Sequence, residues 1–495
     1  MKKTISAVCL FLALCMMFVL AACDNTPKQS NETKQPQGTT SSVATTGGAK
    51  TTEIPEEKLE IPENVDFEEY EFNILGLSQG DYSHIDLVAE DIQEEPINDA
   101  VYERNNFVQD LLNIKINAKI DTKANVVSTA RSNIGSGLDA YDLYLPTMSD
   151  AAPLAQSGLF EDLYTVPYLN VHKPWWDQSV IRDLDINGHL YFTTGEISIL
   201  DDDLCFVLVF NKVAMQEKTD VDVYQIVRDK KWTLGALEQL IKDYNDDTNG
   251  DGKMDDKDQW GMMLNENNIT IFYLSAGERM VGRDEENNSF KFAMTGSRAS
   301  DVISKTLDFM LDNEFFMTGK GGWAGDANTQ LAKFMDGSVL IRATVFKVVR
   351  NMRSMEFDFG VLPNPMFDDD QKEYFTPTSS QGYLPGLCVP TSAEDLERTG
   401  IITEALAYYS HVYLTPAFYD AALNGILLRD QESSEMLDII FNTKVYDIGY
   451  IYNFADMAFS LRKLVQNGSK AFTSEMDKLT DPVNTAIGEM MDKFA

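Results

Sequence analysis

YEFNILGL, residues 70–77, alternates polar and apolar side chains before becoming continuously apolar, which predicts a β-strand. Apolar residues at helical spacing then predict a helix over 97–112, with Asn98 or Asp99 as its N-cap. Residues 114–120 alternate again, and 141–145 form another short strand. This order of strands and helices predicts a parallel sheet with helices on both faces, where ligands bind beyond the carboxyl ends of the strands.

The rest of the chain continues this mixed pattern. With 495 residues it is too long for one compact core, so we expect two or more lobes. The sequence from Ala393 onward is predicted to be mostly helical. Further predicted strands cover 204–210, 339–341, 359–363 and 387–390, and further predicted helices cover 233–244 and 330–335.

The N-terminus has the pattern of a secretory leader. Two lysines precede an apolar run that extends to Ala22. The run ends in Leu20-Ala21-Ala22-Cys23, which resembles the recognition site of lipoprotein signal peptidase. We therefore predict a lipoprotein signal peptide over 1–22 and lipidation of Cys23. Residues 23–64, rich in Thr, Ser, Gln and Pro, are predicted to form a disordered tether.

Composition and missing motifs argue against several functions. The formal net charge is −37, which disfavours nucleic acid and anionic membrane surfaces as partners. The four histidines are scattered, and no common hydrolase, zinc-protease or nucleotide-binding motif is present, so we expect no enzymatic activity. Cys205 and Cys388 lie in apolar runs and are interpreted as small buried residues, with a disulfide between them left open.

Several passages, in order, resemble the family 1 extracellular solute-binding proteins. They are residues 139–143, 155–163, 206–212, 334–341 and the FDFGVLPNP segment 357–365. The resemblance implies a periplasmic-binding-protein-like α/β fold, with two α/β lobes, a hinge and an interlobe ligand cleft. By analogy, lobe 1 comprises 65–167 plus 375–430, and lobe 2 comprises 168–374 plus 431–495.

The same resemblance implies a protein outside the bacterial cell that delivers a small solute to an ABC permease. With the predicted lipidation of Cys23, we expect a monomer that is lipid-anchored to the cell membrane. Carbohydrate is the solute class favoured by the family, supported by the many aromatic residues. A peptide-binding importer subunit, a sensor-associated protein and a cell-surface glycan-binding protein remain as alternatives. The predicted ligand contacts are Gln79, Thr147, Ser149, Trp176, Glu196, Asp201, Tyr273, Trp323, Arg342 and Ser379.

The most specific motif is DTNGDGKMDDKD, residues 247–258, which follows the spacing of an EF-hand-type calcium loop. Glycine stands at loop position six, and Asp replaces the usual Glu at position twelve. A structural calcium ion is therefore predicted, although a solvated acidic turn would have a similar sequence. The predicted ligands are Asp247, Asn249, Asp251, Lys253 through its carbonyl, Asp255 and Asp258.

Overall fold

The structure is a computed structural model. It describes residues 57–242, 244–284, 289–313, 315–318, 327–350, 352, 357–422 and 431–494. All of the described residues belong to one compact unit, Ile54–Ala495. Cys23 and Trp323, two of the predicted functional residues, lie outside the described residues.

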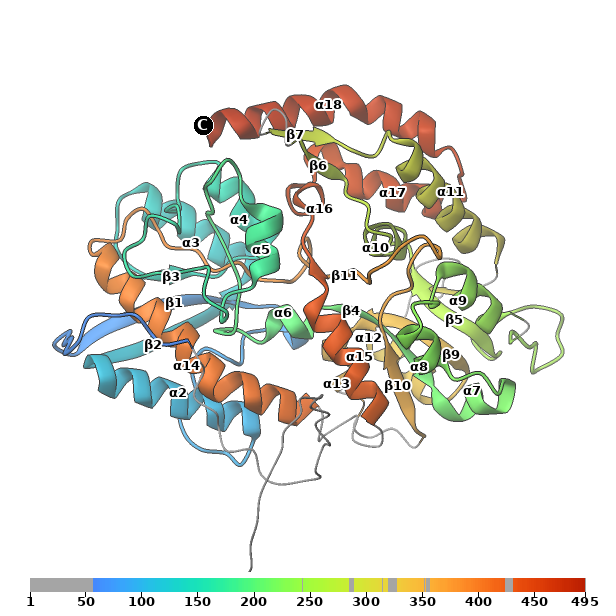
Figure 1. Cartoon of the computed structure of the whole chain (residues 1–495), viewed down its shortest axis with the longest axis horizontal. Helices are drawn as coiled ribbons and strands as arrows, with labels where there is room; N and C mark the ends of the chain where they lie inside the picture. The colour runs from blue at the N-terminus through green and yellow to red at the C-terminus, as the bar shows by residue number, and fades with distance from the viewer. Residues whose placement is uncertain are drawn as a thin grey trace, which may run out of the picture. The chain divides into compact units, whose positions relative to one another are not determined.

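The first lobe is built on a three-stranded parallel sheet in the order β2-β1-β3. The central strand β1 (Tyr70–Ser78) pairs along its whole length with β2 (Ile114–Thr122) and briefly with β3 (Leu143–Tyr144). Figure 1 shows α2 (Pro96–Leu112) and α3 (Lys123–Gly135) on opposite sides of this sheet. The predicted parallel sheet with helices on both faces is therefore confirmed.

The start of α2 differs from the prediction. Its N-cap is Glu95, whose carboxylate accepts a hydrogen bond from the Asn98 backbone N–H. Pro96 at the first helical position has no backbone N–H, and its fixed φ suits the start of a helix, so the cap falls before it. Asp99 instead lies in the first turn of the helix, where it accepts a hydrogen bond from the Gln93 N–H.

The second lobe contains a five-stranded sheet in the order β10-β4-β9-β5-β8. Its inner strand β4 (Phe206–Asn211) is buried from its second residue onward and lies antiparallel to both β10 (Phe359–Leu362) and β9 (Val339–Val345). A continuous apolar run suits a strand covered on both faces. Strand β5 (Trp260–Asn265) continues the sheet parallel to β9 and to β8 (Phe316–Thr318).

Most predicted strands differ from the structure by one or two residues at an end, and two differ by more. Strand β9 extends to Val345, four residues beyond the predicted end, because Arg342 to Val345 continue to pair with β4. The predicted strand 387–390 does not form a ladder. Leu387, Cys388 and Pro390 instead make isolated bridges to Thr193, Tyr144 and Phe160, and the last two of these partners belong to the first lobe.

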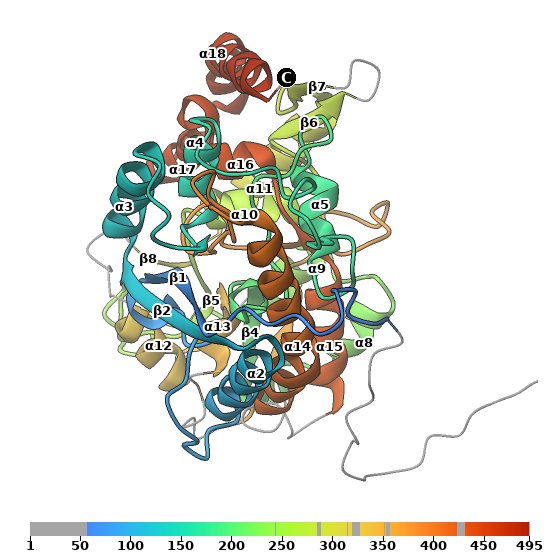
Figure 2. The same cartoon turned by 90° about the vertical axis from the view of Figure 1, so that its left-hand side faces the viewer.

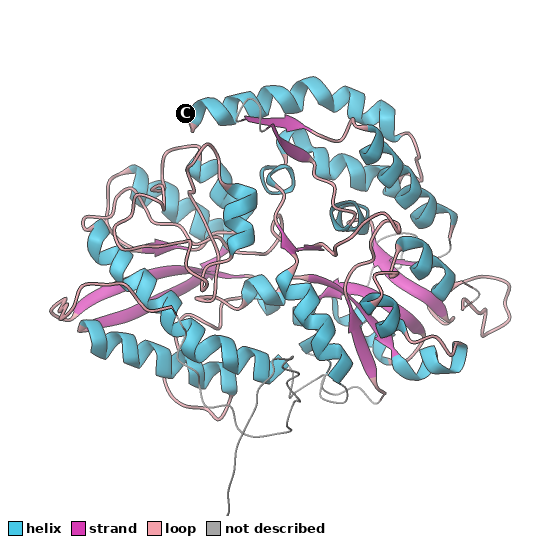
Figure 3. Cartoon of the chain, viewed as in Figure 1, coloured by secondary structure: helices cyan, strands magenta, loops and turns pink. Residues whose placement is uncertain are grey.

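Helices cover both sheets and form the C-terminal part of the chain, as expected (Figures 2 and 3). The long helix α14 (Leu396–Ala422) packs against α2, and α15 (Gln431–Asn442) packs against β10. The remaining helices are α4 (Met148–Ala155), α5 (Gln178–Leu184), α6 (Leu200–Asp203), α7 (Lys212–Lys218), α8 (Val223–Arg228), α9 (Leu234–Ile241), α10 (Asn268–Ser275), α11 (Ser297–Asp312), α12 (Ala327–Met335), α13 (Phe346–Arg350), α16 (Ile448–Tyr452), α17 (Met457–Gln466) and α18 (Phe472–Lys493), with short 3-10 turns η1 (Gly80–Tyr82) and η4 (Phe454–Asp456). The small sheets are β6 (Val281–Asp284) with β7 (Ser289–Phe292), and β11 (Thr376–Pro377) with β12 (Lys444–Val445).

The folded region begins before the predicted end of the tether. Leu59, Ile61 and Val65 pack against the main hydrophobic core. Lys173 also forms ion pairs with Glu57 and Glu60. These apolar residues are spaced closely enough to attach the segment, so residues 57–64 belong with the folded part.

Cys205 and Cys388 are both buried and both free, as the interpretation of small core residues requires. Across the described ranges, no helix combines the length and the apolar character that a membrane crossing needs.

Candidate functional site

A cavity of about 530 Å³ lies where residues of the two lobes meet, within the size range of small-molecule sites. The first lobe contributes Gln79 and Tyr82, which follow the carboxyl end of β1, and the second contributes Arg342 from β9. The segment around Ser379, which returns from the second lobe, forms another wall. Of the ten predicted ligand contacts, Gln79, Arg342 and Ser379 line this cavity.

Arg342 is the most unusual of the lining residues. Only 2% of its surface is exposed, and its Nε and Nη1 have no hydrogen-bond partner in the part of the chain that the structure describes. Burial lowers the pKa of its guanidinium to about 10, opposed by the nearby Tyr82. A buried cation without hydrogen bonds is costly, which points to a ligand that supplies the missing acceptors.

Gln79, from the first lobe, also has a buried donor without a hydrogen-bond partner in the described chain. Its Nε2 is buried without a hydrogen-bond partner among the described residues. The turn that holds it is firmly built, because Ser83 Oγ accepts a bond from the Gln79 N–H and donates one to the Gly80 carbonyl. The backbone at Gln79 is therefore held by the turn, and the side-chain amide has a donor without a partner in the described chain.

Two tyrosines complete the cavity. The rings of Tyr82 and Tyr383 have centroids 4.5 Å apart with an angle of 37° between their planes. Tyr383 is 42% exposed, so its ring is accessible to a ligand. Neither tyrosine was among the predicted contacts. The only signals in the sequence are the glycines that precede them, Gly80 and Gly382, which mark turns.

The two remaining polar predictions from the first lobe, Thr147 and Ser149, are not among the described residues that line this cavity. Ser149 Oγ donates a hydrogen bond of 2.6 Å to the Gln381 carbonyl, and Thr147 Oγ1 donates one of 2.7 Å to Asp150. The Ser379 carbonyl accepts bonds from the backbone N–H groups of Gly382, Tyr383 and Leu384. These contacts hold the loop that carries Tyr383.

Trp176, Glu196 and Asp201 line a separate cavity of about 300 Å³. Trp176 is 1% exposed, and its indole N–H donates to Glu404, as does that of Trp175. Glu196 accepts hydrogen bonds from Thr415 Oγ1 and pairs with His411 Nδ1 at 2.7 Å. The structure thus gives Trp176 and Glu196 partners within the protein and places them away from Arg342.

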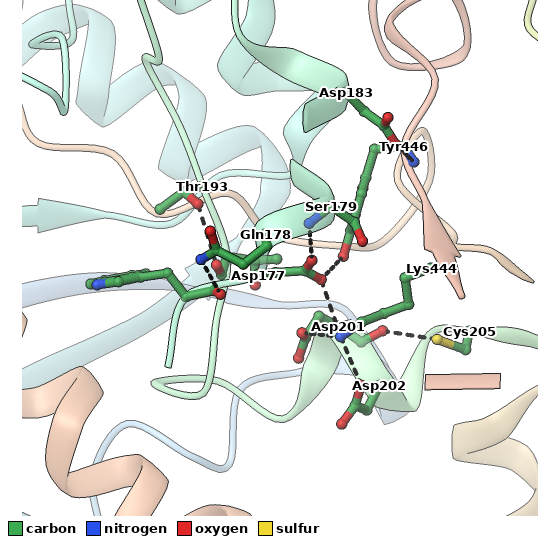
Figure 4. A network of polar contacts seen from close by, with 12 residues as sticks. Asp177, Gln178, Ser179, Asp183, Thr193, Asp201, Asp202, Cys205, Lys444 and Tyr446 are labelled. Atoms are coloured by element: carbon green, nitrogen blue, oxygen red, sulfur yellow. Dashed lines mark hydrogen bonds and ion pairs between the residues drawn. The ribbon is translucent and has the colours of Figure 1, made fainter. Parts of the chain in front are cut away.

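Asp201 belongs to a buried cluster around Lys444, shown in Figure 4. The Lys444 ammonium lies 2.7 Å from Asp201, 2.8 Å from Asp202 and 3.1 Å from Asp177. Burial acts to lower the pKa of Lys444, but the three carboxylates outweigh it and raise that pKa well above its ordinary value. The acidic run therefore has an internal counter-ion.

Tyr273 lines neither cavity. Its side chain is fully buried in α10, and its hydroxyl donates a hydrogen bond of 3.1 Å to the Arg279 carbonyl. In this structure its contacts are those of a packing residue.

In the predicted calcium loop, backbone N–H groups already hold the carboxylates. Asp247 accepts from Gly250, Asp251 and Gly252, and Asp258 accepts from Thr248 and Asp255. Backbone hydrogen bonds lower the pKa of Asp258, so it remains an anion. Within the described ranges, no three His, Cys, Asp or Glu side chains lie close enough together to hold a metal ion in this conformation.

No family model matches the chain, and no curated protein matches it in sequence. Solved structures match its fold. The maltose-binding periplasmic protein from Listeria monocytogenes in complex with maltose matches with a TM-score of 0.55 at 12% identity, over 85% of this chain and 98% of that chain. A cyclo/maltodextrin-binding protein complexed with maltotetraose matches with a TM-score of 0.54 at 13% identity, over 86% and 97%.

An ABC substrate-binding protein from Listeria monocytogenes in complex with cycloalternan matches with a TM-score of 0.51 at 13% identity, over 85% of this chain and 99% of that chain. The chain therefore has the two-lobed α/β fold of the solute-binding proteins of ABC transporters. The resemblance noted in the sequence is confirmed at the level of the fold.

Proposed function

We propose that this protein is an extracytoplasmic solute-binding protein that delivers a carbohydrate to an ABC importer and catalyses no reaction. The fold supports this proposal, because the solved structures that share it include proteins that bind maltose, maltotetraose or cycloalternan. We propose further that the protein is a monomer anchored to the bacterial membrane through lipid on Cys23, as the leader sequence predicts.

The observation that carries the proposal is the pair of unused donors in the larger cavity. Arg342 and Gln79 come from different lobes, and each has buried donor atoms without a partner in the described chain. A solute bound between them would supply acceptors to both and would favour closure of the lobes upon it. Tyr82 and Tyr383 offer ring faces of the kind that pack against sugars.

Two other functions share this geometry. A sensor-associated or cell-surface glycan-binding protein would bind in the same cavity but would have no permease partner. A peptide-binding importer subunit would use the same donors for backbone carbonyls. The carbohydrate proposal is favoured because paired aromatic rings accompany the polar donors. Genes for permease subunits beside this gene would support import, and a histidine-kinase gene would support sensing.

The proposal is tested by calorimetric titration of the purified protein with mono- and oligosaccharides, peptides and amino acids. We expect saturable binding of one saccharide class with no product after prolonged incubation. Binding of peptides alone would move the function to peptide uptake, and turnover of any ligand would contradict the non-enzyme proposal.

We propose also that the loop 247–258 binds a structural calcium ion. Asp247, Asn249, Asp251 and Asp255 provide oxygens at the expected loop positions, and the positive φ of Gly252, 79°, provides the sharp turn at position six. Such an ion would reduce the repulsion between crowded carboxylates, and it would have no part in solute binding because the loop contributes no residue to the larger cavity.

A further inference from the structure

The charge of the larger cavity is opposite to that of the chain. The protein has 78 acidic and 41 basic residues. Nevertheless, three basic side chains line the cavity, those of Lys123, Arg342 and Arg462, and none of its described lining residues is Asp or Glu. An acidic protein that surrounds one cavity with cations alone has a local potential suited to an anion.

Arg342 is not neutralised by its own sheet. Its register partners are Val209 on β4 and Met263 on β5, both apolar. The other deeply buried arginines have polar or charged partners within the protein. Arg104 donates to Ser410, Asn105 and backbone carbonyls, and Arg350 pairs with Asp203 at 2.8 Å. Because this protein elsewhere supplies partners for its buried guanidinium groups, the lack of one at Arg342 marks a binding group.

The two other cations strengthen the field around Arg342. Arg462 lies over the ring of Phe459, and no carboxylate of the described chain forms an ion pair with it. Lys123 pairs with Asp150 at 3.2 Å but remains 41% exposed. Lys123 is also the first residue of α3, and Asn268 is the first residue of α10, so two helices begin at the cavity wall. Helix N-termini carry partial positive charge and add to the attraction for an anion.

The shape of the site indicates more than a small inorganic anion. Its volume of about 530 Å³ is far larger than one carboxylate needs, and the tyrosine pair and Gln79 lie beside the cations. A planar carboxylate fits the fork of a guanidinium, while hydroxyl groups fit the amide donor and a ring face fits the tyrosines. A sugar that carries a carboxylate satisfies all of these groups at once.

We propose that the solute is an acidic saccharide, a uronic acid or an oligosaccharide that contains one, and that Arg342 binds its carboxylate. This inference rests on the proposed function, since it takes the cavity to be the solute site, and it narrows the solute class to anionic sugars.

The test compares ligands that differ only in charge. The purified full-length protein is titrated calorimetrically with galacturonate, glucuronate, mannuronate and guluronate oligosaccharides, with the methyl esters of each, and with maltose and maltotetraose. We expect at least one uronate to bind, and its methyl ester to bind on the order of 100-fold more weakly, because loss of a buried charge partner has an effect of this size.

The outcomes separate the acidic-saccharide inference from the proposed carbohydrate-binding function on which it rests. Equal binding of a saccharide and its methyl ester, or binding of neutral sugars alone, would overturn the acidic-saccharide inference and leave the carbohydrate function intact. If no saccharide of either charge binds, both the inference and the proposed carbohydrate function are wrong.

Substitutions of Arg342 provide a second test of the proposal. We expect Arg342→Gln to weaken uronate binding on the order of 100-fold while changing methyl-ester binding little, and Arg342→Lys to restore part of the loss. Arg131→Gln, at an exposed position on α3, is the matched control and should bind as the unmodified protein does. A uronate affinity unchanged in Arg342→Gln would overturn the assignment. If this variant does not fold, the methyl-ester comparison still decides.

Discussion

The ammonium group of Lys444 lies 2.7 Å from a carboxylate oxygen of Asp201, a residue 243 positions earlier in the chain. The pair joins α6, just before the first strand of the second lobe, to β12, which follows α15. Asp177 and Asp202 contact the same ammonium, so one cation balances three buried or half-buried carboxylates (Figure 4).

Removing this cation should destabilise the protein strongly. In Lys444→Met the three carboxylates keep their positions but lose their counter-charge, and breaking a buried ion pair from one side costs about 3–5 kcal/mol. Chemical denaturation should show this loss in the free energy of unfolding. Lys470→Met is the matched control, because Lys470 contacts Asp308 and Asp312 at the surface and its loss should have little effect. Equal effects of the two substitutions would contradict the role given to the Lys444 cluster.

Arg342 should have the opposite effect on the ligand-free protein. A buried guanidinium with unused donors opposes folding, so Arg342→Met should raise the free energy of unfolding by about 1–2 kcal/mol while strongly weakening uronate binding. Arg104→Met is the contrast, because Arg104 is equally buried but fully engaged in hydrogen bonds, and it should lower stability by about 3 kcal/mol. Denaturant titration of both variants measures the difference. A large loss of stability in Arg342→Met would mean that the side chain has a structural partner.

Glu404 should make stability depend on pH. Burial raises the pKa of its carboxyl to about 7, although the indole N–H groups of Trp175 and Trp176 and the Asn170 N–H favour the charged form. The folded protein therefore binds a proton that the unfolded chain has lost, between about pH 4.5 and pH 7. The stabilisation from this group is complete at low pH and is lost as the pH rises through 7.

The measurement is the free energy of unfolding at pH 5 and at pH 8 for the unmodified protein and for Glu404→Gln, which cannot titrate. We expect the advantage of the unmodified protein over the variant to shrink as the pH rises. A constant difference between the two proteins across this range would show that the Glu404 pKa is not raised.

Local pattern predicted much of the fold but only part of the site. The strand 70–77 and the helix 97–112 were predictable because a polar–apolar period depends only on neighbours in the sequence. Arg342 was recognisable as a polar residue among apolar ones. The sequence could not predict that Arg342 lacks a counter-ion among the described residues, because its neighbours in the sheet, Val209 and Met263, come from distant strands.

Trp176 is a residue that the sequence suggested as a ligand contact but whose partner in the structure is distant in the chain. A tryptophan after Pro174 in an irregular segment suggested a ring facing the cleft. Its indole N–H instead donates to Glu404, 228 residues later, in the middle of α14. Long-range partners of this kind decide whether a polar aromatic packs or binds, and the sequence around Trp176 contains no trace of Glu404. The prediction that Trp176 contacts the ligand therefore stays without support from its surroundings.

The tyrosine pair should contribute to affinity without contributing to stability. Tyr383 is 42% exposed and its ring contacts that of Tyr82, so Tyr383→Ala should weaken binding of the preferred saccharide about tenfold, in line with the value of an aromatic contact. Tyr168→Ala removes an equally exposed tyrosine that does not line the cavity and serves as the control. Calorimetric titration compares the two, and equal affinities would exclude Tyr383 from the solute site.

Calcium should stabilise the protein through the loop 247–258. An ion that binds only the folded state adds about 1–3 kcal/mol when its concentration is ten to one hundred times the Kd. Scanning calorimetry with calcium and with excess chelator should therefore show a higher melting temperature with the ion. Asp247→Asn should remove this difference, because it replaces the negatively charged carboxylate predicted at loop position one with a neutral amide. Asp256→Asn changes an adjacent acid that is not a predicted ligand, so it should retain the calcium effect. Identical scans with calcium and chelator would leave the loop as a solvated acidic turn whose carboxylates are satisfied by backbone N–H groups alone.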